Sequence, residues 1–316
     1  MKANNETNRE EEMNIRQLIA TIQYKIKYGS TVEWYNFWYI VLRKHQKIIP
    51  QVASIDDTIR RIVDGHCSVS RFGDGEMLLT SPDKSIRFQK GDEKLAARLR
   101  EILMSNHENH LVCISDVFSD LHRYNRKARR FWRTHFYLYG AWWDRYLTEN
   151  RLYYNTFVTR PYMDFASKEA CGRWFKDMQR IWEGRDVIFI EGEKSRLGVG
   201  NDLFDGARSI RRILCPPSDA FDRYEEIYET ACRFEKEALY LIALGPTATV
   251  LAYDLYRTGR QAIDVGHVDI EYEWYRMGAT AKVKLPAKHV NESAPDGRQM
   301  ADAGETYRQQ IVAHIR

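Results

Sequence analysis

Short apolar runs alternate with amphipathic stretches along most of this 316-residue chain. The apolar runs are rich in β-branched and aromatic residues, which is typical of strands, and they cover 67–73, 85–89, 110–115, 156–160, 186–193, 209–216, 238–244 and 261–266. Between them, apolar residues recur at helical spacing, which predicts helices over 92–104, 119–138, 168–182, 221–237, 247–258 and 268–277. Repeated alternation of strand and helix indicates an α/β domain with a largely parallel sheet.

The N-terminal part of the chain departs from this pattern. Residues 1–13 are polar and acidic and are expected to be disordered, and a helical pattern follows over 14–49. Its second part, WYNFWYIVLRKHQK, joins an aromatic cluster to a basic end. One interpretation is a helix that docks on the domain. The other is a helix that lies in a membrane interface over residues 32–48 and turns basic side chains toward anionic lipid, namely Arg43, Lys44 and Lys47.

No segment has the pattern of a signal peptide or of a membrane-spanning helix. The N-terminus lacks an apolar core, and the longest apolar stretch runs only from Trp34 to Leu42, whereas a span needs about 20 residues. After Lys288 the chain becomes polar, and a short final helix is expected to reach Arg316.

Charge and cysteine content exclude some classes of protein. The chain has 48 basic and 44 acidic residues, and its net charge of +4 is too small to predict bulk binding of nucleic acid. The five cysteines are odd in number and show no C-x-x-C spacing, so neither a disulfide framework nor a zinc site is expected. The expected location is therefore a reducing cytoplasm.

Candidate chemistry begins in the segment RFGDGE, directly after the first strong strand. Asp74 and Glu76 are two positions apart, and in an extended turn both side chains would point to one side. Carboxylate oxygens suit Mg²⁺ or Mn²⁺, and such an ion could neutralise a diphosphate leaving group. Gly73 and Gly75 would let a ligand approach the backbone, and Arg71 could bind phosphate. The alternative is an ordinary acidic turn that holds a salt bridge.

Three further polar loops follow apolar strands, where ligands bind in open α/β sheets. The loop after the strand at 186–193 is rich in glycine and charge. The loop after the strand at 238–244 begins a helix whose N–H groups favour anions. The loop after the strand at 156–160 offers Arg160 as a phosphate clamp beside the stacking group Tyr162. A structural role remains the alternative for each loop. The candidate binding residues in these loops are Glu193, Arg196, Asn201, Asp202, Gly245, Pro246, Thr247, Arg160 and Tyr162.

The segment DVGHVDIEYEW places several carboxylates after the last strand of the pattern. In a helix that begins at Val268, Asp269 and Glu273 are neighbours on one face, where two like charges are unfavourable. A general base or a second metal contact would account for this pair. His267 could titrate near neutral pH or bind phosphate. The alternative is a charged surface turn.

These segments together resemble a family of bacterial glycosyltransferases with the GT-D type fold, which was once a domain of unknown function. The matching segments are, in order, SRFGDGE, IRFQ, TRPYMD, GEKSRLGVGNDLF, RRILCP, LGPTATVLAYDL and DVGHVDIEYEW, and KHVNE closes the match. The resemblance implies a Rossmann-like nucleotide-sugar-binding domain with helices on both faces of the sheet. It divides the chain into an N-terminal helical extension over 1–51, a glycosyltransferase domain over 52–292 and a C-terminal tail or helix over 293–316.

The resemblance also implies roles for particular residues. The family's aspartate-x-glutamate metal motif matches Asp74 and Glu76. A catalytic carboxylate is implied in the late segment, with Glu273 as the first choice ahead of Glu271 and Asp269. That carboxylate would take the acceptor proton in a reaction that inverts the anomeric centre, whereas a retaining reaction would give it another role. His267 completes the candidate catalytic residues.

The expected activity is metal-dependent transfer of a sugar from a nucleotide sugar, with UDP as the expected nucleotide and Mn²⁺ or Mg²⁺ as cofactor. A glycan, a glycoprotein or a lipid-linked molecule would be the acceptor, in the synthesis of cell-surface glycans. The location would be the cytoplasm, with peripheral contact at the inner face of the membrane, and a homo-oligomer is compatible with the sequence.

An NAD-binding oxidoreductase on the same fold class is disfavoured, because no G-x-G-x-x-G follows the first strand, and two other functions stay open. One is a metal-dependent phosphohydrolase or nucleotidase that uses the same two carboxylates. The other is a non-enzymatic nucleic-acid-binding protein that uses the basic and aromatic segment from Tyr124 to Tyr146. The near-balanced net charge argues against nucleic acid as a partner.

Overall fold

The computed structural model describes residues 29–42, 47–285, 288 and 302–316, and its centre is a sheet of nine strands. The strand order is β1-β4-β3-β2-β8-β7-β5-β6-β9, and every neighbouring pair is parallel. This confirms the parallel α/β sheet expected from the sequence. The strands are β1 (Gln51–Val52), β2 (Ser68–Phe72), β3 (His110–Ile114), β4 (Leu152–Asn155), β5 (Asp186–Gly192), β6 (Ser209–Cys215), β7 (Leu239–Ala243), β8 (Gln261–Asp264) and β9 (Ile311–His314).

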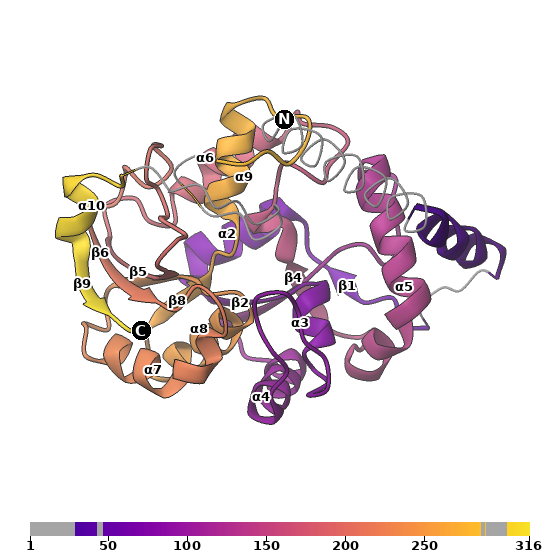
Figure 1. The fold of residues 1–316 in the computed structure, drawn as a ribbon, viewed down its shortest axis with the longest axis horizontal. Coiled ribbons are helices and arrows are strands. Elements are labelled where there is room, and N and C mark those ends of the chain that lie inside the picture. Colours follow the sequence, from indigo (N-terminus) through magenta and orange to yellow (C-terminus); the bar gives the residue numbers. More distant parts are fainter. Residues whose placement is uncertain (1–28, 43–46, 286–287, 289–301) are drawn as a thin grey trace, which may run out of the picture.

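Helices cover both faces of the sheet, as Figure 1 shows. Helices α4, α7 and α8 lie on one face, α2, α6 and α9 lie on the other, and α5 stands near β1 beside the helical segment 29–41. The arrangement is Rossmann-like, as the resemblance implied. The helices are α2 (Ile55–Gly65), α3 (Asp74–Leu78), α4 (Glu93–Met104), α5 (Arg126–Tyr146), α6 (Cys171–Gln179), α7 (Tyr224–Cys232), α8 (Pro246–Arg257), α9 (Val268–Arg276) and α10 (Glu305–Gln310), with 3₁₀ turns η1 (Thr156–Thr159) and η2 (Ala220–Arg223).

The central strands are buried on both sides because helices cover both faces. Along β5, Val187 and Phe189 pack in the larger core, whereas Ile188 and Ile190 pack in the second core on the other face. Full burial of an apolar side chain of this size contributes about 1.5–3 kcal/mol to stability. The two-sided burial explains why β5 has a continuous apolar sequence instead of an alternating one.

The sheet consists of two halves, each continuous in sequence. Strands β1 to β4 form one half, and β5 to β9 form the other. The halves meet where β2 pairs with β8, with Val69 beside Ile263. From this β2–β8 seam the chain connections lead away in opposite directions, which is the point at which open α/β sheets bind their ligands.

Two of the expected strands are wrong. Residues 85–89 form only an isolated bridge between Ile86 and Gln89, because this short run lies inside a turn that is closed by a Gly91 N–H bond to Ser85 Oγ at 2.9 Å. Residues 156–160 begin with η1 instead of a strand. The Asn155 side chain accepts a bond from the Phe157 N–H at 3.0 Å, which turns the chain directly after β4. The remaining expected strands are confirmed, with small differences in their bounds.

The elements that were not expected from the sequence include β1, α2 and β9. Ser54 caps α2, because its Oγ accepts a bond from the Asp57 N–H at 3.0 Å. Strand β9 pairs with β6 at the C-terminal end, where the sequence suggested that the final helix would continue to Arg316. Helix α10 ends at Gln310 instead.

Some expectations fall on parts of the chain that the structure does not describe. These expectations are the disorder of residues 1–13, the first part of the helix that starts at residue 14, the lipid-facing role of Arg43 and Lys44, and the boundary at 292–293. In the described part, no helix combines the length and the apolar character that crossing a membrane requires.

Candidate functional site

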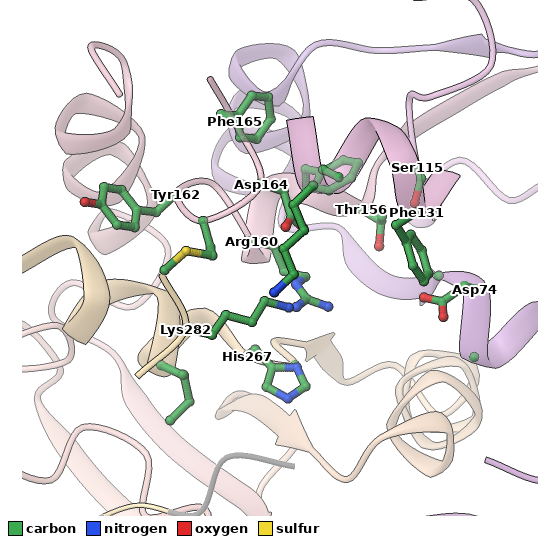
Figure 2. A pocket seen from close by; sticks show the side chains of 18 of the residues that line it. Asp74, Ser115, Phe131, Thr156, Arg160, Tyr162, Asp164, Phe165, His267 and Lys282 are labelled. Carbon is green, nitrogen blue, oxygen red and sulfur yellow. The ribbon is translucent and has the colours of Figure 1, made fainter. Parts of the chain in front are cut away.

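A cavity of about 960 Å³ opens at the carboxyl ends of the strands, at the β2–β8 seam. Its walls come from α3, from α5, from the segment 156–168 and from the loops before α8 and α9, and the segment 278–282 lines it as well. Figure 2 shows Arg160, His267 and Lys282 pointing into the same space, with Asp74 on the opposite wall.

The carboxylates of Asp74 and Glu76 both lie on the wall after β2. The expected extended turn is wrong here, because Asp74–Leu78 forms the short helix α3. Glu76 Oε2 accepts a hydrogen bond from the Gly73 N–H at 2.9 Å, which caps that helix. Burial raises the pKa of the Glu76 carboxyl, and the charge of Arg71 opposes this shift. Further positive charge beside this carboxylate would therefore stabilise its ionised form.

A metal ion at this wall would need ligands from a substrate. Among the residues that the structure describes, no group of three or more His, Cys, Asp or Glu side chains is arranged to hold an ion. Two carboxylates that leave the other positions to water and substrate phosphates are the usual set for Mg²⁺. Asp74 and Glu76, which line the same cavity, fit that set.

Arg71 lies on the same wall and is fixed by an ion pair across the seam. Its Nη2 lies 2.8 Å from Asp264 Oδ1, and its Nε donates to the Asp264 backbone oxygen at 2.9 Å. Thr249 Oγ1 and the Gly266 N–H also contact the Asp264 carboxylate. Burial raises the pKa of Asp264, whereas the Arg71 charge lowers it. The guanidinium is thus held in one orientation, as binding of an anion requires.

Helix α8 begins at the cavity, but its first residues do not all reach it. Gly245 lines the cavity with a φ of +54°, and a Cβ added there would lie 2.7 Å from the Phe88 ring. Pro246 and Thr247 are buried behind it, with Thr247 Oγ1 at 3.4 Å from Gln89 Oε1. Of the three residues expected in this loop, Gly245 is the one on the wall.

The loop after η1 places Arg160 at the cavity, and hydrogen bonds to Glu271, which does not line the cavity, hold this loop in place. Glu271 Oε2 accepts bonds from the N–H groups of Tyr162 at 3.0 Å and Met163 at 2.7 Å, and its Oε1 lies 4.0 Å from Arg160 Nε. Burial raises the pKa of Glu271 to about 7, although Arg160 opposes this shift. The Tyr162 side chain is largely buried and donates to the Ala279 oxygen at 3.0 Å. Glu271 therefore positions the loop, and Tyr162 lines the cavity while its hydroxyl is held by the Ala279 oxygen.

Helix α9 begins at Val268, as expected, and places Asp269 beside Glu273. The Asn201 amide donates to both carboxylates at 2.7 Å, and Lys288 Nζ lies 2.7 Å from Asp269 Oδ2 and 3.1 Å from Glu273 Oε1. This lysine explains how the two like charges coexist without a metal ion. Asp269 and His267 line the cavity, whereas Glu273 is not among its lining residues.

The remaining candidates lie outside the cavity wall. Glu193 contacts His314 at 3.2 Å near the surface, and Asp202 accepts a bond from the Tyr272 hydroxyl at 3.0 Å. Arg196 has a φ of +51°, in the loop whose neighbours Ser195 and Leu197 do line the cavity. Together with Asn201, these residues connect the loop after β5 to α9 and to the C-terminal strand.

Several cavity residues were not identified from the sequence. Those from α5 belong to a segment whose basic and aromatic character was noted, but helical spacing alone did not show which side faces a ligand. Ser115 follows β3 as the other site residues follow their strands, which was the available signal. The additional polar and aromatic lining residues include Ser115, Lys127, Phe131, Trp132, Thr156, Asp164, Lys168 and Lys282.

Two curated proteins are similar to most of this chain. Glycosyltransferase GlyD of Streptococcus pneumoniae serotype 4 is 43% identical over 276 residues, which is 87% of this chain and 34% of that protein. The probable glycosyl transferase Gly of Streptococcus gordonii is 42% identical over 267 residues, which is 84% of this chain and 39% of that protein. The chain therefore spans well under half the length of these relatives.

Solved structures and a family model agree with this similarity. A structure of the domain of unknown function 1792, described as a distinct glycosyltransferase fold, is 44% identical with a TM-score of 0.81, covering 85% of this chain and 96% of that one. A glycosyltransferase with this domain from Streptococcus sanguinis is 41% identical with a TM-score of 0.81, covering 84% and 100%. The model of the glycosyltransferase GT-D fold matches residues 69–293. This chain belongs to the GT-D-fold glycosyltransferase family.

Proposed function

We propose that this protein transfers a sugar from a nucleotide-sugar donor, with UDP as the nucleotide, to a hydroxyl group of an acceptor. The observation that carries the proposal is the charge distribution around one cavity at the β2–β8 seam. Arg71 and Arg160 supply positive charge, while Asp74 and Glu76 supply two carboxylates on the wall after β2. A nucleoside diphosphate needs both, because its phosphates bind guanidinium groups directly and bind carboxylates through a divalent cation.

Asp74 and Glu76 would hold Mn²⁺ or Mg²⁺ in this proposal. When bound, the ion supplies positive charge that stabilises the diphosphate as it leaves. The raised pKa of Glu76 supports the assignment, because a carboxylate in a buried place is stabilised by a neighbouring cation. Arg71 needs no rearrangement for its part, since Asp264 already fixes its guanidinium.

His267 is the residue of the late segment that we assign to the acceptor proton. Its ring projects into the cavity from the end of β8 (Figure 2), and a proton acceptor must touch the reacting hydroxyl. Asp269 lines the cavity, but Asn201 and Lys288 hold its two oxygens. Glu273 shares these partners behind the wall. The geometry therefore favours His267 over Glu273, and the two carboxylates act as positioning residues.

The acceptor belongs to the glycans, glycoproteins or lipid-linked molecules from which cell-surface glycans are built, and the enzyme works in the cytoplasm at the inner face of the membrane. The free cysteines of the described chain, most of them buried, are compatible with a reducing compartment. The apolar and aromatic side chains on the α5 side of the cavity, Phe131 and Trp132 among them, suit the face of an acceptor sugar.

Calorimetric titration with UDP, UDP-glucose, UDP-GlcNAc and GDP-mannose, each with and without Mn²⁺, tests the proposal. We expect one nucleotide class to bind, and to bind at least tenfold more tightly with the metal present. Asp74→Asn should remove the metal effect, whereas Asp83→Asn, which changes an exposed carboxylate outside the cavity wall, should not. Absence of binding by every nucleotide with Mn²⁺ present would refute the donor site. Rapid phosphate release from free nucleotides would show a phosphohydrolase instead.

A further inference from the structure

The helical segment 29–41 docks on α5 through polar contacts of Asn36 and Glu33 and through aromatic contacts to Tyr137. The Asn36 amide is buried and donates to the Arg130 backbone oxygen at 3.1 Å and to Thr134 Oγ1 at 2.9 Å. The rings of Tyr35 and Tyr137 stack with centroids 5.3 Å apart. In Figure 1 the segment (indigo) lies at one end of the molecule, next to α5 and far from β9.

A stripe of apolar side chains on this segment is exposed, although Trp34 at its start also contacts the Tyr137 ring of α5, with centroids 6.2 Å apart. Trp34 and Phe37 are 53% and 57% exposed, and Val41 one turn further along is 52% exposed. These three positions recur at i, i+3 and i+7, so they form one stripe along the helix. Most of the large apolar side chains that the described residues expose lie on residues 34–42 and on α5, namely Trp34, Phe37, Ile40, Val41, Leu42, Phe131 and Leu138.

Positive charge flanks the stripe. The N-terminal half of α5 carries five basic residues, and the first acidic residue of that helix is Asp144, in its last turn. Basic side chains near a helix N-terminus are unfavourable with the helix dipole, so helix stability does not account for them. Within the described part of the chain, Arg130 is the one of these residues that pairs with a carboxylate, Glu33 of the docked segment at 2.5 Å. The five residues are Arg126, Lys127, Arg129, Arg130 and Arg133.

We infer that the apolar stripe of residues 34–41 and the basic N-terminal half of α5 together form a docking surface for an anionic lipid bilayer. The stripe would enter the interface between headgroups and acyl chains, and the arginines would face anionic headgroups. A second copy of the chain fits this surface less well, because a symmetric dimer would bring the like charges of two α5 helices together.

The docking surface adjoins the cavity. Phe131 is 46% exposed on α5 and also lines the cavity, and Lys127 on the same helix does so as well. A protein docked in this way would hold the α5 wall of the cavity near the headgroups. The inference names a partner for the proposed cytoplasmic enzyme and rests on that proposal for its location, but the lipid contact itself can be measured without catalysis.

Co-sedimentation of the full chain with vesicles of phosphatidylcholine alone, or of phosphatidylcholine with phosphatidylglycerol, tests the inference. We expect binding to the anionic vesicles that weakens with salt, and little binding to the neutral ones. Phe37→Ser with Val41→Ser should abolish measurable binding. Arg126→Gln with Arg129→Gln should weaken it about 30-fold, since each basic residue near the surface contributes roughly fivefold.

Met104→Ser is the matched control, because it removes an equally exposed apolar side chain at the end of α4, away from this surface. Its binding should equal that of the unchanged protein. Calorimetric nucleotide binding should be unchanged in every variant, which separates a failure of this inference from a failure of the donor site. Equal binding to neutral and anionic vesicles, no binding to either, or full binding by both double variants would overturn the inference. Conversion of a dimer to a monomer by Phe37→Ser with Val41→Ser would show a protein interface instead.

Discussion

The Arg71 guanidinium lies 2.8 Å from the Asp264 carboxylate and thereby joins the two halves of the sheet at the edge of the cavity. Arg71 comes from β2, and Asp264 ends β8. Gly266 packs directly against the guanidinium, because a Cβ added to it would lie 1.9 Å from Arg71 Nη2. The ion pair between Arg71 and Asp264 therefore also fixes the position of the Arg71 charge in the candidate donor site.

Gly266→Ala should displace this guanidinium and weaken donor binding by about tenfold or more, since a hydrogen bond to a charged group contributes roughly 1.5–3 kcal/mol. Gly266 has a φ of +45°, so the substitution also strains the backbone. Gly259→Ala is the control, because Gly259 has a φ of +83° and no neighbouring atom within 4 Å of the added Cβ. Titration calorimetry should show normal donor affinity for the control only. Equal affinities for the two variants would contradict the role of Arg71.

Glu76 has two functions that substitution can separate. Glu76→Gln should keep the bond from the Gly73 N–H and hence the stability of α3, but it should weaken metal-dependent donor binding. Glu76→Ala should lose both, with about 1 kcal/mol less free energy of unfolding. Denaturant titration and calorimetry on the two variants measure the two effects. If Glu76→Gln binds the metal–donor pair as the unchanged protein does, Glu76 is a cap and not a ligand.

Lys288 pairs with the buried Asp269 and the half-buried Glu273, so its removal should lower the free energy of unfolding. Lys288→Met leaves Asp269 buried beside Glu273 without a cation, and breaking a buried ion pair costs about 3–5 kcal/mol. Asp269→Asn combined with Lys288→Met should recover much of this loss. Lys84→Met is a suitable control, because Lys84 pairs with Asp83 at the exposed surface and should contribute less than about 1 kcal/mol. A loss of similar size in both single variants would show that the buried pair has no special weight.

Glu271 makes the stability of the protein depend on pH. Its pKa is raised to about 7 in the folded protein, so the stabilisation is complete below the unfolded pKa near 4.5 and is lost as pH rises through 7. Relative to Glu271→Gln, the unchanged protein should lose roughly 3 kcal/mol of unfolding free energy between pH 4.5 and 8. Urea titrations of both proteins across this range measure the difference. A difference that stays constant with pH would mean that Glu271 titrates normally.

The choice between His267 and Glu273 can be made by kinetics. His267→Asn should lower kcat by about 100-fold or more with little change in donor affinity, as expected for loss of a proton acceptor. Glu273→Gln, which keeps the size of a side chain behind the wall, should change kcat only slightly. The reverse result would return the proton-transfer role to the carboxylate.

The parallel sheet could be predicted because its strands are buried on both faces and therefore read as continuous apolar runs, as in β5 and β7. The short edge strands lack that signal. Strand β1 has two residues, and β9 follows α10 without a turn, so neither produces a period of its own in the sequence. Strand β4 ends directly before the strand expected at 156–160, because the Asn155 side chain accepts a bond from the Phe157 N–H and turns the chain into η1.

The wall residues near strand ends could be predicted for a similar reason, since the carboxyl ends of parallel strands meet at one edge. Asp74, Glu76, Arg160 and His267 do line one cavity. Distances between elements could not be predicted. The motif favoured Glu273 as the base. Its carboxylate instead accepts a bond from Lys288 Nζ at 3.1 Å, fifteen residues later, and Glu273 is not among the residues that line the cavity. The contribution of α5 to the cavity required knowledge of which side of that helix faces inward.

The division of the sheet into two sequence-continuous halves has a consequence for how the molecule forms. At the seam, the Ala262 N–H bonds the Ser68 hydroxyl across 194 residues of chain, while each half pairs strands much closer in sequence. Non-local pairing is slow, so the two half-sheets should form first and join last. On the ribosome, β2 must wait with an unpaired edge until β8 has been made. Because the cavity lies across this junction, a bound donor would stabilise only the joined state and should slow its unfolding.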